Sequence, residues 1–259
     1  MNLVYHSGML WLAALSILIV SLISLVGLFT ISLNVIRLRK VLFALISLSV
    51  GALLGDVFLH ILPELEVTPK ITSLIFVGFL IFFVLEKFLR WHHGHEGEVH
   101  EVGVEIDSGH ANQHIGYMNI ISDGLHNLID GIVIGGAYLV STEVGIATTI
   151  AVILHEIPQE IGDFGLLLHV GFSRARALFL NFLSALASFA GLLIVVALKG
   201  NSEGLIELIL PITAGGFLYI AASDLVPELQ KTSSARKSLI QLIAIITGFA
   251  LMAILLALE

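Results

Sequence analysis

The sequence predicts an all-α, polytopic membrane protein of eight transmembrane helices with inverted repeats. Hydrophobic residues make up 57% of the 259-residue chain, its mean hydropathy is +1.02, and only 12% of its residues are charged. A soluble domain of this length cannot hide so large an apolar fraction in its core. The chain contains no Cys, which excludes disulfides, thiolate metal sites and nucleophilic Cys chemistry.

Eight apolar runs are long enough to cross a bilayer, whose hydrocarbon core requires about 20 helical residues. They cover approximately residues 9–34, 41–64, 70–90, 115–140, 144–170, 175–198, 204–227 and 238–258. The first run is too long for a cleavable signal and is expected to be a span. The segment 91–114 lacks apolar periodicity and is crowded with His and acidic residues, so a mobile His-rich loop is expected there.

Basic residues predict the orientation of the spans. Ten Lys and Arg residues fall in alternate loops, and only Lys70 and Lys199 fall on the opposite side. The positive-inside rule therefore places both termini outside and the 91–114 loop in the cytoplasm of a multi-pass protein of the plasma (cell inner) membrane. That loop could bind or sense metal weakly, or simply keep a linker solvated.

A short internal match predicts the repeats. The segments "GALLGDVFLHILPEL" (51–65) and "GGFLYIAASDLVPEL" (215–229) share Gly, Leu and the sequence Pro-Glu-Leu at equal positions. The second predicted span runs outward and the seventh runs inward, so the same motif occurs in opposite orientations. Inverted repeats of this kind are typical of transporters, with the binding site near the middle of the membrane.

Two stripes of polar residues lie in the centres of the fourth and fifth spans. In the fourth, positions i, i+3, i+4 and i+7 of one helix face hold Asp123, His126, Asn127 and Asp130. The fifth carries a broader stripe made of His155, Glu156, Gln159, Glu160 and Asp163. Pro158 lies within the second stripe and is expected to kink the helix, freeing carbonyls for a cavity or a cation.

These stripes favour a divalent metal site. Each carboxylate at the centre of a bilayer costs at least ~2.5 kcal/mol, and neither stripe contains Lys or Arg to offset its charge. Imidazole nitrogen with carboxylate and amide oxygen suits Zn²⁺, Fe²⁺ or Mn²⁺, and the lack of sulfur argues against Cu⁺. The alternative is that the polar groups only hydrogen-bond neighbouring helices and hold the bundle together.

Further polar positions have two interpretations each. In the second span, positions i, i+4 and i+8 hold Asp56, His60 and Glu64, which could relay ions toward the outer mouth. Asp224 and Glu228 of the seventh span could do so at the inner mouth. Helix end-capping or interfacial solvation is the alternative. Three polar residues of the sixth span could complete a ligand shell or pack against a neighbouring helix: Asn181, Ser184 and Ser188. The net charge of −8 lies largely in one loop and in buried positions, and no nucleic-acid partner is expected.

Together, "HNLIDG" (126–131), "HEIPQEIGDF" (155–164), eight spans and a His-rich loop between the third and fourth resemble the ZIP (Zrt/Irt-like) zinc and iron transporters. The subgroup with HExPHExGD in its fifth span is the closer match. The resemblance implies a non-enzymatic, single transmembrane transporter domain over residues 1–259. It would be a homodimer in the lipid bilayer that imports zinc, with Fe, Mn and Cd as further candidates.

The resemblance also implies residue roles at a binuclear site. His126, Asp130, His155 and Gln159 match the main transport site, while Asn127 and Glu156 match a second site that shares Asp130. Family members move one helix bundle past a static scaffold to give alternating access. Gln159 stands where the subgroup has His, which predicts a harder and more permissive site. Because the first span begins near residue 9, a minimal form without the subgroup's large extracellular domain is expected.

Two other functions are compatible with the residues. "HEIPQ" falls one His short of the H-E-x-x-H helix, so His155 and Glu156 could form an intramembrane zinc metallohydrolase with His126 as the missing ligand. The repeated motifs and the acids at the mouths suit a transport path and have no role in a hydrolase. A metal exporter is the second alternative, although the chain lacks room for the cytoplasmic domain usual in cation-diffusion exporters.

Overall fold

The computed structural model describes residues 3–30, 35–93, 113–198, 202–231 and 234–257, and within these ranges the protein is helical without β-strands. The helices are α1 (Leu3–Ile23), α2 (Gly27–Thr30), α3 (Val35–Asp56), α4 (Pro69–His93), α5 (Gln113–Val140), α6 (Thr142–His169), α7 (Arg174–Ala185), α8 (Ala187–Leu198), α9 (Ser202–Tyr219), α10 (Val226–Gln230) and α11 (Ala235–Leu256). Short 3₁₀ segments follow α1 (Ser24–Val26) and precede the loop before α4 (Leu62–Glu64).

These helices account for the eight apolar runs predicted from the sequence. Five stretches are long and apolar enough to cross a membrane: 9–29, 40–64, 174–198, 204–230 and 235–256. α5 and α6, with 28 residues each, are also long enough to cross a membrane, but the ionisable groups at their centres make them less apolar than these five stretches. The sixth run is divided at Leu186 into α7 and α8. The predicted loop 91–114 is shorter at both ends, because α4 reaches His93 and α5 begins at Gln113; residues 94–112 lie outside the described part of the chain.

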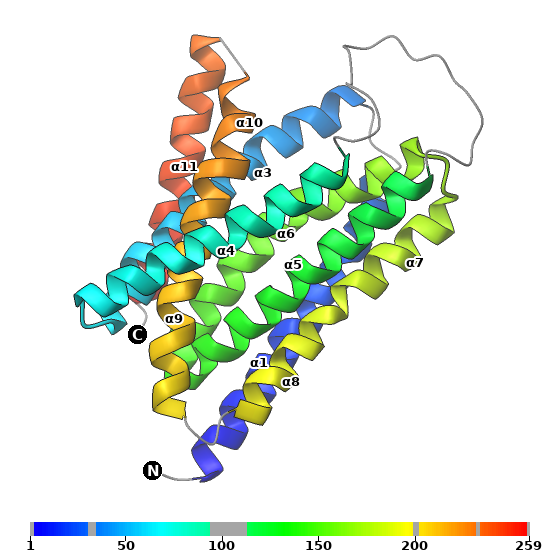
Figure 1. Ribbon diagram of the computed structural model, residues 1–259. Helices are drawn as coiled ribbons and strands as arrows, with labels where there is room; N and C mark the ends of the chain where they lie inside the picture. Colours follow the sequence, from blue (N-terminus) through cyan, green and yellow to red (C-terminus); the bar gives the residue numbers. More distant parts are fainter. Residues whose placement is uncertain (1–2, 31–34, 94–112, 199–201, 232–233, 258–259) are drawn as a thin grey trace.

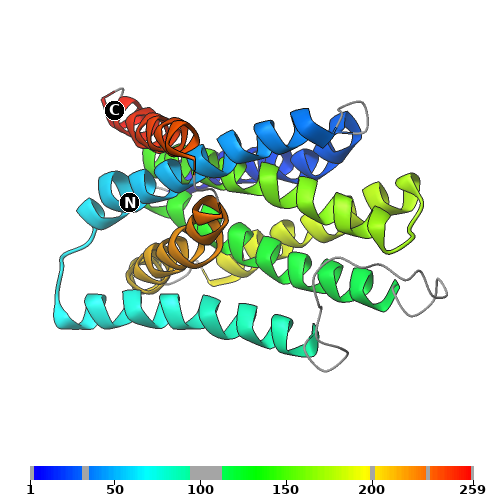
Figure 2. The same cartoon turned by 90° about the horizontal axis from the view of Figure 1, so that it is seen from above.

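The helices form two packed groups (Figure 1). In one group, α3 packs along α11 and α4 packs along α9. In the other, α5 contacts α6 and α8, and α1 lies against both α5 and α6. Seen from above, α4 follows one edge of the molecule and α3 with α11 the opposite edge, with α5 and α6 between them (Figure 2). The largest contact between the two groups is that of α3 with α6.

Reciprocal glycines allow close helix crossings within these groups. A Cβ atom added at Gly51 of α3 would lie 1.9 Å from the carbonyl oxygen of Ile245 in α11. One added at Gly215 of α9 would lie 1.9 Å from the carbonyl oxygen of Ile75 in α4. Small residues let membrane helices approach to backbone contact, where dispersion forces are largest. Gly51 and Gly215 are the first residues of the repeated motif, so each repeat forms the same type of crossing.

The second half of the motif also has the same local structure in both repeats. Val57–Ile61 and Ile220–Leu225 are π-helical, and in each case a proline, Pro63 or Pro227, stands two residues after the end of the segment. A proline cannot donate to the preceding turn, and a wider π turn is one way for a helix to accommodate that loss. Two segments that run in opposite directions thus share a glycine crossing, a π turn and a proline, which supports the inverted repeat predicted from the sequence.

Candidate metal site

The site lies between α5 and α6, which form an antiparallel hairpin joined at Ser141. The Ser141 side chain accepts a hydrogen bond from the backbone N–H of Val144 at 3.1 Å and so caps the start of α6. Both helices are 28 residues long, and their polar stripes lie at similar distances from the turn. The short connection therefore brings the two central stripes face to face.

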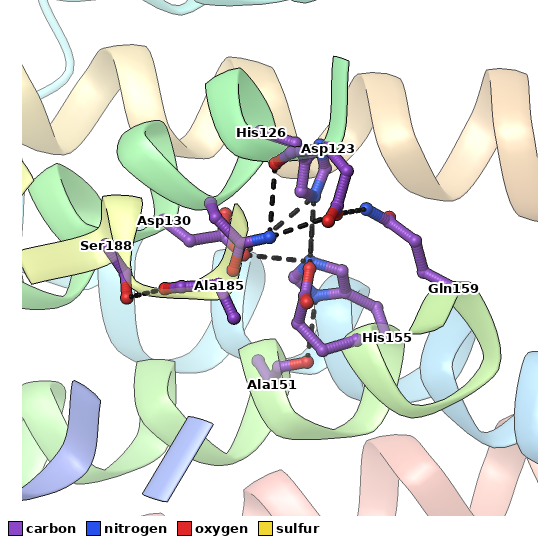
Figure 3. Close-up of polar contacts among 10 residues, drawn as sticks. Asp123, His126, Asp130, Ala151, His155, Gln159, Ala185 and Ser188 are labelled. Atoms are coloured by element: carbon purple, nitrogen blue, oxygen red, sulfur yellow. Dashed lines mark hydrogen bonds and ion pairs between the residues drawn. The ribbon is translucent and has the colours of Figure 1, made fainter. Parts of the chain in front are cut away.

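Four ionisable side chains converge at the centre of this hairpin (Figure 3). The Nε2 atoms of His126 and His155 lie 3.3 Å apart, and Oδ2 of Asp130 lies 3.3 Å from Nε2 of His155 and 3.8 Å from that of His126. Oε1 of Glu156 lies 3.5 Å from Nε2 of His126 and 3.7 Å from that of His155. The ligand atoms of all four residues lie within 4.8 Å of one another, which is close enough to share one metal ion.

A second group of acids adjoins the first. Asp123, Glu156 and Glu160 also offer oxygen atoms within 4.8 Å of one another, and all three residues are buried. Glu156 belongs to both groups, whereas the family resemblance implied that Asp130 would be shared. Glu156 thus adjoins both groups from one position of α6.

Asp123 is held by three hydrogen-bond donors. The amide nitrogen of Asn127 lies 3.0 Å and that of Gln159 3.3 Å from Oδ1 of Asp123, and the Ser184 hydroxyl donates to Oδ2. The amide nitrogen of Gln159 is thus turned toward Asp123, as Figure 3 shows. These donors fix the orientation of a carboxylate at the edge of the second group.

The orientation of the His155 ring is also fixed. Its Nδ1 atom lies 3.1 Å from the carbonyl oxygen of Ala151, one turn earlier in α6. A carbonyl oxygen can only accept, so Nδ1 carries the proton and Nε2 presents its lone pair to the site. A backbone partner of this kind is the usual support of a metal-binding imidazole. Phe217 of α9 lies edge-on to the same ring, with the ring centroids 6.0 Å apart.

The acids of the site have little compensation from the protein. Asp130 is fully buried, Glu156 and Glu160 are 1% exposed, and α5 and α6 contain no Lys or Arg. Among the described residues, both oxygens of Asp130 and Glu160, and Oε1 of Glu156, accept no hydrogen bond. Buried charges normally require a partner or a metal ion. The arrangement therefore suits cation binding better than helix-to-helix hydrogen bonding.

A cavity of about 310 Å³ leads to the site. Its polar lining includes Asn119, Ser122, Asp123, His126, Gln159, Asp163 and Asp224, and its apolar wall includes Phe82 and Tyr219. The His126 side chain is 18% exposed, whereas that of His155 is 1% exposed, so the cavity reaches the site at His126. The lining residues of α5 lie between Asn119 and Ile129, mostly in its first half, and those of α6 lie in its second half, so the cavity lies toward the end where α5 begins.

Several predicted positions lie apart from the two groups. Asp163 lines the cavity and accepts a hydrogen bond from the Asn119 amide at 2.9 Å. Asn181 is buried, and its amide donates to the Glu160 carbonyl at 3.3 Å. Asp56, the last residue of α3, accepts from the Thr148 hydroxyl at 3.0 Å, and Nδ1 of His60, in the π-helical segment after α3, lies 3.6 Å from Oδ1 of Asp56. Their metal-binding roles stay predictions.

Two further residues contact the predicted acids: Asn119, which was not among the candidates from the sequence, and Ser184, which was a candidate for the ligand shell. Asn119 stands four residues before Asp123 and extends the polar stripe of α5 by one turn, which its spacing could have indicated. Ser184 is a small polar residue of α7, and such residues usually pack against neighbouring membrane helices. Its bond to Asp123 depends on how α7 lies against α5, which no local pattern encodes.

Comparison with known proteins agrees with this architecture. The family model described as "ZIP Zinc transporter" matches residues 92–256. The chain is 34% identical to "Zinc transporter ZIP13 homolog" of Drosophila melanogaster over 83% of this chain and 78% of the relative. It is also 34% identical to "Zinc transporter YKE4" of Saccharomyces cerevisiae, over 85% of this chain and 72% of that relative. The chain therefore belongs to the ZIP zinc transporter family, whose members are membrane transporters and not enzymes.

Proposed function

We propose that this protein imports zinc into the cytoplasm through the site between α5 and α6. The curated relatives are named zinc transporters. The ligand set of two imidazoles and two carboxylates also suits zinc. Membership of a transporter family disfavours the hydrolase alternative, in which Glu156 would activate a zinc-bound water.

The separation of the two imidazole nitrogens is the observation that carries the proposal. Zinc binds His nitrogen at about 2.0–2.1 Å with tetrahedral geometry, so two such ligands on one ion lie roughly 3.3 Å apart. The Nε2 atoms of His126 and His155 lie 3.3 Å apart, and Oδ2 of Asp130 lies 3.3 Å from the second. The side chains are thus spaced for a tetrahedral ion without rearrangement of the helices.

The second acid group supports a binuclear site. Glu156 would bridge a first ion held by His126, Asp130 and His155 and a second ion held by Asp123 and Glu160. Asn127 and Asn181 offer additional amide oxygens, because both of these buried atoms accept no hydrogen bond from the described residues. Gln159 would act on the second ion indirectly, by orienting Asp123.

The position of the cavity supports alternating access with the inner side open. The cavity approaches His126 from the end of the bundle where α5 begins, which the distribution of basic residues places in the cytoplasm. Asp56 at the end of α3 and His60 in the π-helical segment that follows are buried. Movement of the α5–α6 group against the α3–α11 group would close the inner path and open the outer one.

Four finer features belong to the same proposal. The protein lies in the plasma (cell inner) membrane with both termini outside and the 91–114 loop in the cytoplasm. It forms a homodimer. Fe²⁺, Mn²⁺ and Cd²⁺ are further substrates, because two imidazoles with carboxylates do not exclude them. The whole chain forms one transporter domain.

Metal flux into proteoliposomes tests the function. Purified protein is reconstituted, and entry of zinc is followed with an internal fluorescent indicator while Fe²⁺, Mn²⁺ and Cd²⁺ compete outside. Zinc uptake above that of protein-free liposomes is expected, with weaker competition by Mn²⁺. Hydrolysis of lipid or peptide substrates without metal flux in the same preparation would contradict the proposal.

A further inference from the structure

Pro158 leaves one backbone carbonyl of α6 without its helical donor. In an α-helix the N–H of residue i donates to the carbonyl of residue i−4, and proline has no N–H. Pro158 lies inside α6, so the carbonyl that loses its partner is that of Leu154, the residue directly before His155. An unpaired carbonyl in the interior of a membrane protein costs several kcal/mol. The sequence predicted that such a carbonyl would face a cavity or a cation.

The carbonyl instead receives a hydrogen bond from another helix. The Ser49 hydroxyl of α3 donates to the Leu154 carbonyl at 2.5 Å, and Ser49 is fully buried. The same hydroxyl lies 2.8 Å from the carbonyl of Leu45 in its own helix, so its single proton serves two acceptors. The Leu45 carbonyl already has a helical donor, whereas the Leu154 carbonyl does not. The bond to Leu154 is therefore the one that satisfies an otherwise unpaired group.

This contact adjoins the candidate metal site. The two turns of α6 from Ala151 to Pro158 carry His155 and Glu156, and the Ala151 carbonyl orients the His155 ring. Pro158 interrupts the backbone hydrogen bonds of this stretch of α6, which could otherwise rotate about the helix axis. The contact from α3 restrains that rotation. A second bond between the same helices, from Thr148 to Asp56 at 3.0 Å, lies about two turns nearer the start of α6.

We propose that Ser49 is a positioning residue for the metal site: its hydroxyl replaces the backbone donor that Pro158 removes and thereby holds His155 and Glu156 in their binding orientation. This inference rests on the proposed function, since it assumes that these two side chains bind the ion. It assigns α3, which contributes none of the described clustered ligands, a direct part in the geometry of the site.

Zinc affinity of purified variants tests the positioning role. Ser49→Ala is compared with Ser47→Ala, because Ser47 is also fully buried on α3. Within the described part of the chain, the Ser47 hydroxyl donates only to the Phe43 carbonyl, one turn earlier in the same helix, at 2.8 Å. Competition with a fluorescent zinc indicator measures affinity in detergent. Ser49→Ala should weaken zinc binding roughly fivefold, as expected for a lost buried hydrogen bond, while Ser47→Ala stays near wild type. Ser49→Thr keeps the hydroxyl and should recover most of the loss.

A double-mutant cycle tests the cause. In Pro158→Ala, residue 158 regains an N–H that can donate to Leu154, so the Ser49 hydroxyl is no longer needed. Ser49→Ala should lower the Tm of the zinc-free wild type by several degrees but leave the Tm of Pro158→Ala unchanged. Likewise, Ser49→Ala should weaken zinc binding when residue 158 is Pro and should leave zinc binding unchanged in Pro158→Ala.

Equal affinities of Ser49→Ala and Ser47→Ala would overturn the positioning role. An equal loss of Tm in both backgrounds would overturn the proposed link to Pro158. If the wild-type protein binds no zinc, the proposed function fails, and the Tm cycle of the zinc-free protein still decides whether Ser49 replaces the missing donor. The two proposals can therefore fail separately.

Discussion

Oε1 of Glu156 lies 3.5 Å from Nε2 of His126, so a carboxylate of α6 faces an imidazole of α5 across the hairpin. Glu156 also belongs to the acid group with Asp123 and Glu160. One side chain thus adjoins both candidate ion positions, and its removal should affect both.

Substitution of Glu156 and Glu160 distinguishes a binuclear from a mononuclear site. Glu160→Gln should abolish binding of the second zinc ion and leave the first, because Glu160 belongs only to the acid group. Glu156→Gln should weaken both ions. Zinc content after equilibrium dialysis, measured by mass spectrometry, gives the number of bound ions. Identical zinc content in the wild type and Glu160→Gln would contradict the binuclear proposal.

Removal of a central ligand should abolish transport without unfolding the protein. His155→Ala and Asp130→Ala each remove a ligand atom from the first group, and uptake should fall at least about 100-fold. Even the loss of a residue that only hydrogen-bonds to a metal ligand lowers metal affinity or activity by about 10–100-fold. His169→Ala, in the last turn of the same helix, is the matched control. Uptake by proteoliposomes is normalised to the monodisperse protein recovered. Full uptake by both variants would refute the assignment.

Gln159 should influence which metal is preferred. The side chain now donates to Asp123, and Gln159→His would place an imidazole beside His126 and His155. An added nitrogen ligand favours zinc over manganese, so the ratio of zinc to manganese uptake should rise several-fold. Competition between the two metals in one uptake assay measures this ratio. Gln159→Asn keeps an amide and should leave the ratio of zinc to manganese uptake unchanged. A rise of this ratio in Gln159→Asn would show that the rise in Gln159→His does not come from the added imidazole nitrogen.

Gly215 should tolerate no side chain. A Cβ atom at this position would lie 1.9 Å from the Ile75 carbonyl oxygen, so Gly215→Ala must separate α9 from α4 and should cost about 3 kcal/mol or more. Gly165→Ala is the control, because a Cβ there meets nothing within 4 Å, and alanine should stabilise α6 by up to about 1 kcal/mol. The Tm values of the two variants are compared by heating samples and measuring the folded protein that remains by size-exclusion chromatography. Equal Tm values would show that the crossing relaxes at little cost.

The chain has no Cys, so a single introduced Cys is the one position of this protein that a thiol reagent can label. Labelling of such variants tests the predicted orientation. Lys70 and Lys231 lie on opposite predicted sides, and their side chains are 69% and 70% exposed. An impermeant maleimide added to intact cells should label Lys70→Cys, but label Lys231→Cys only after permeabilisation. Surface ion pairs such as Lys70 with Glu207 contribute little stability, so both variants should fold. Labelling of Lys231→Cys in intact cells would invert the topology.

Local patterns in the sequence were sufficient to predict the helices and the polar stripes. A run of apolar residues determines a membrane helix because every backbone group must be satisfied within the segment. The spacing of Asp123, His126, Asn127 and Asp130 determines one helix face because the helical period is constant. The glycine and proline of the repeated motif likewise indicated two segments with the same local structure.

Contacts between distant segments were decided only by the tertiary structure. Asp56 and His60 have ligand chemistry, but the packing of α3 on α6 places Asp56 against Thr148 and outside the described metal-capable groups. Glu156 belongs to both groups of potential ligands, and the Leu154 carbonyl, which loses its helical donor to Pro158, accepts a hydrogen bond from Ser49, 105 residues away in the sequence. The period of a helix specifies which side chains share a face, whereas the partner of that face depends on how all the helices pack together.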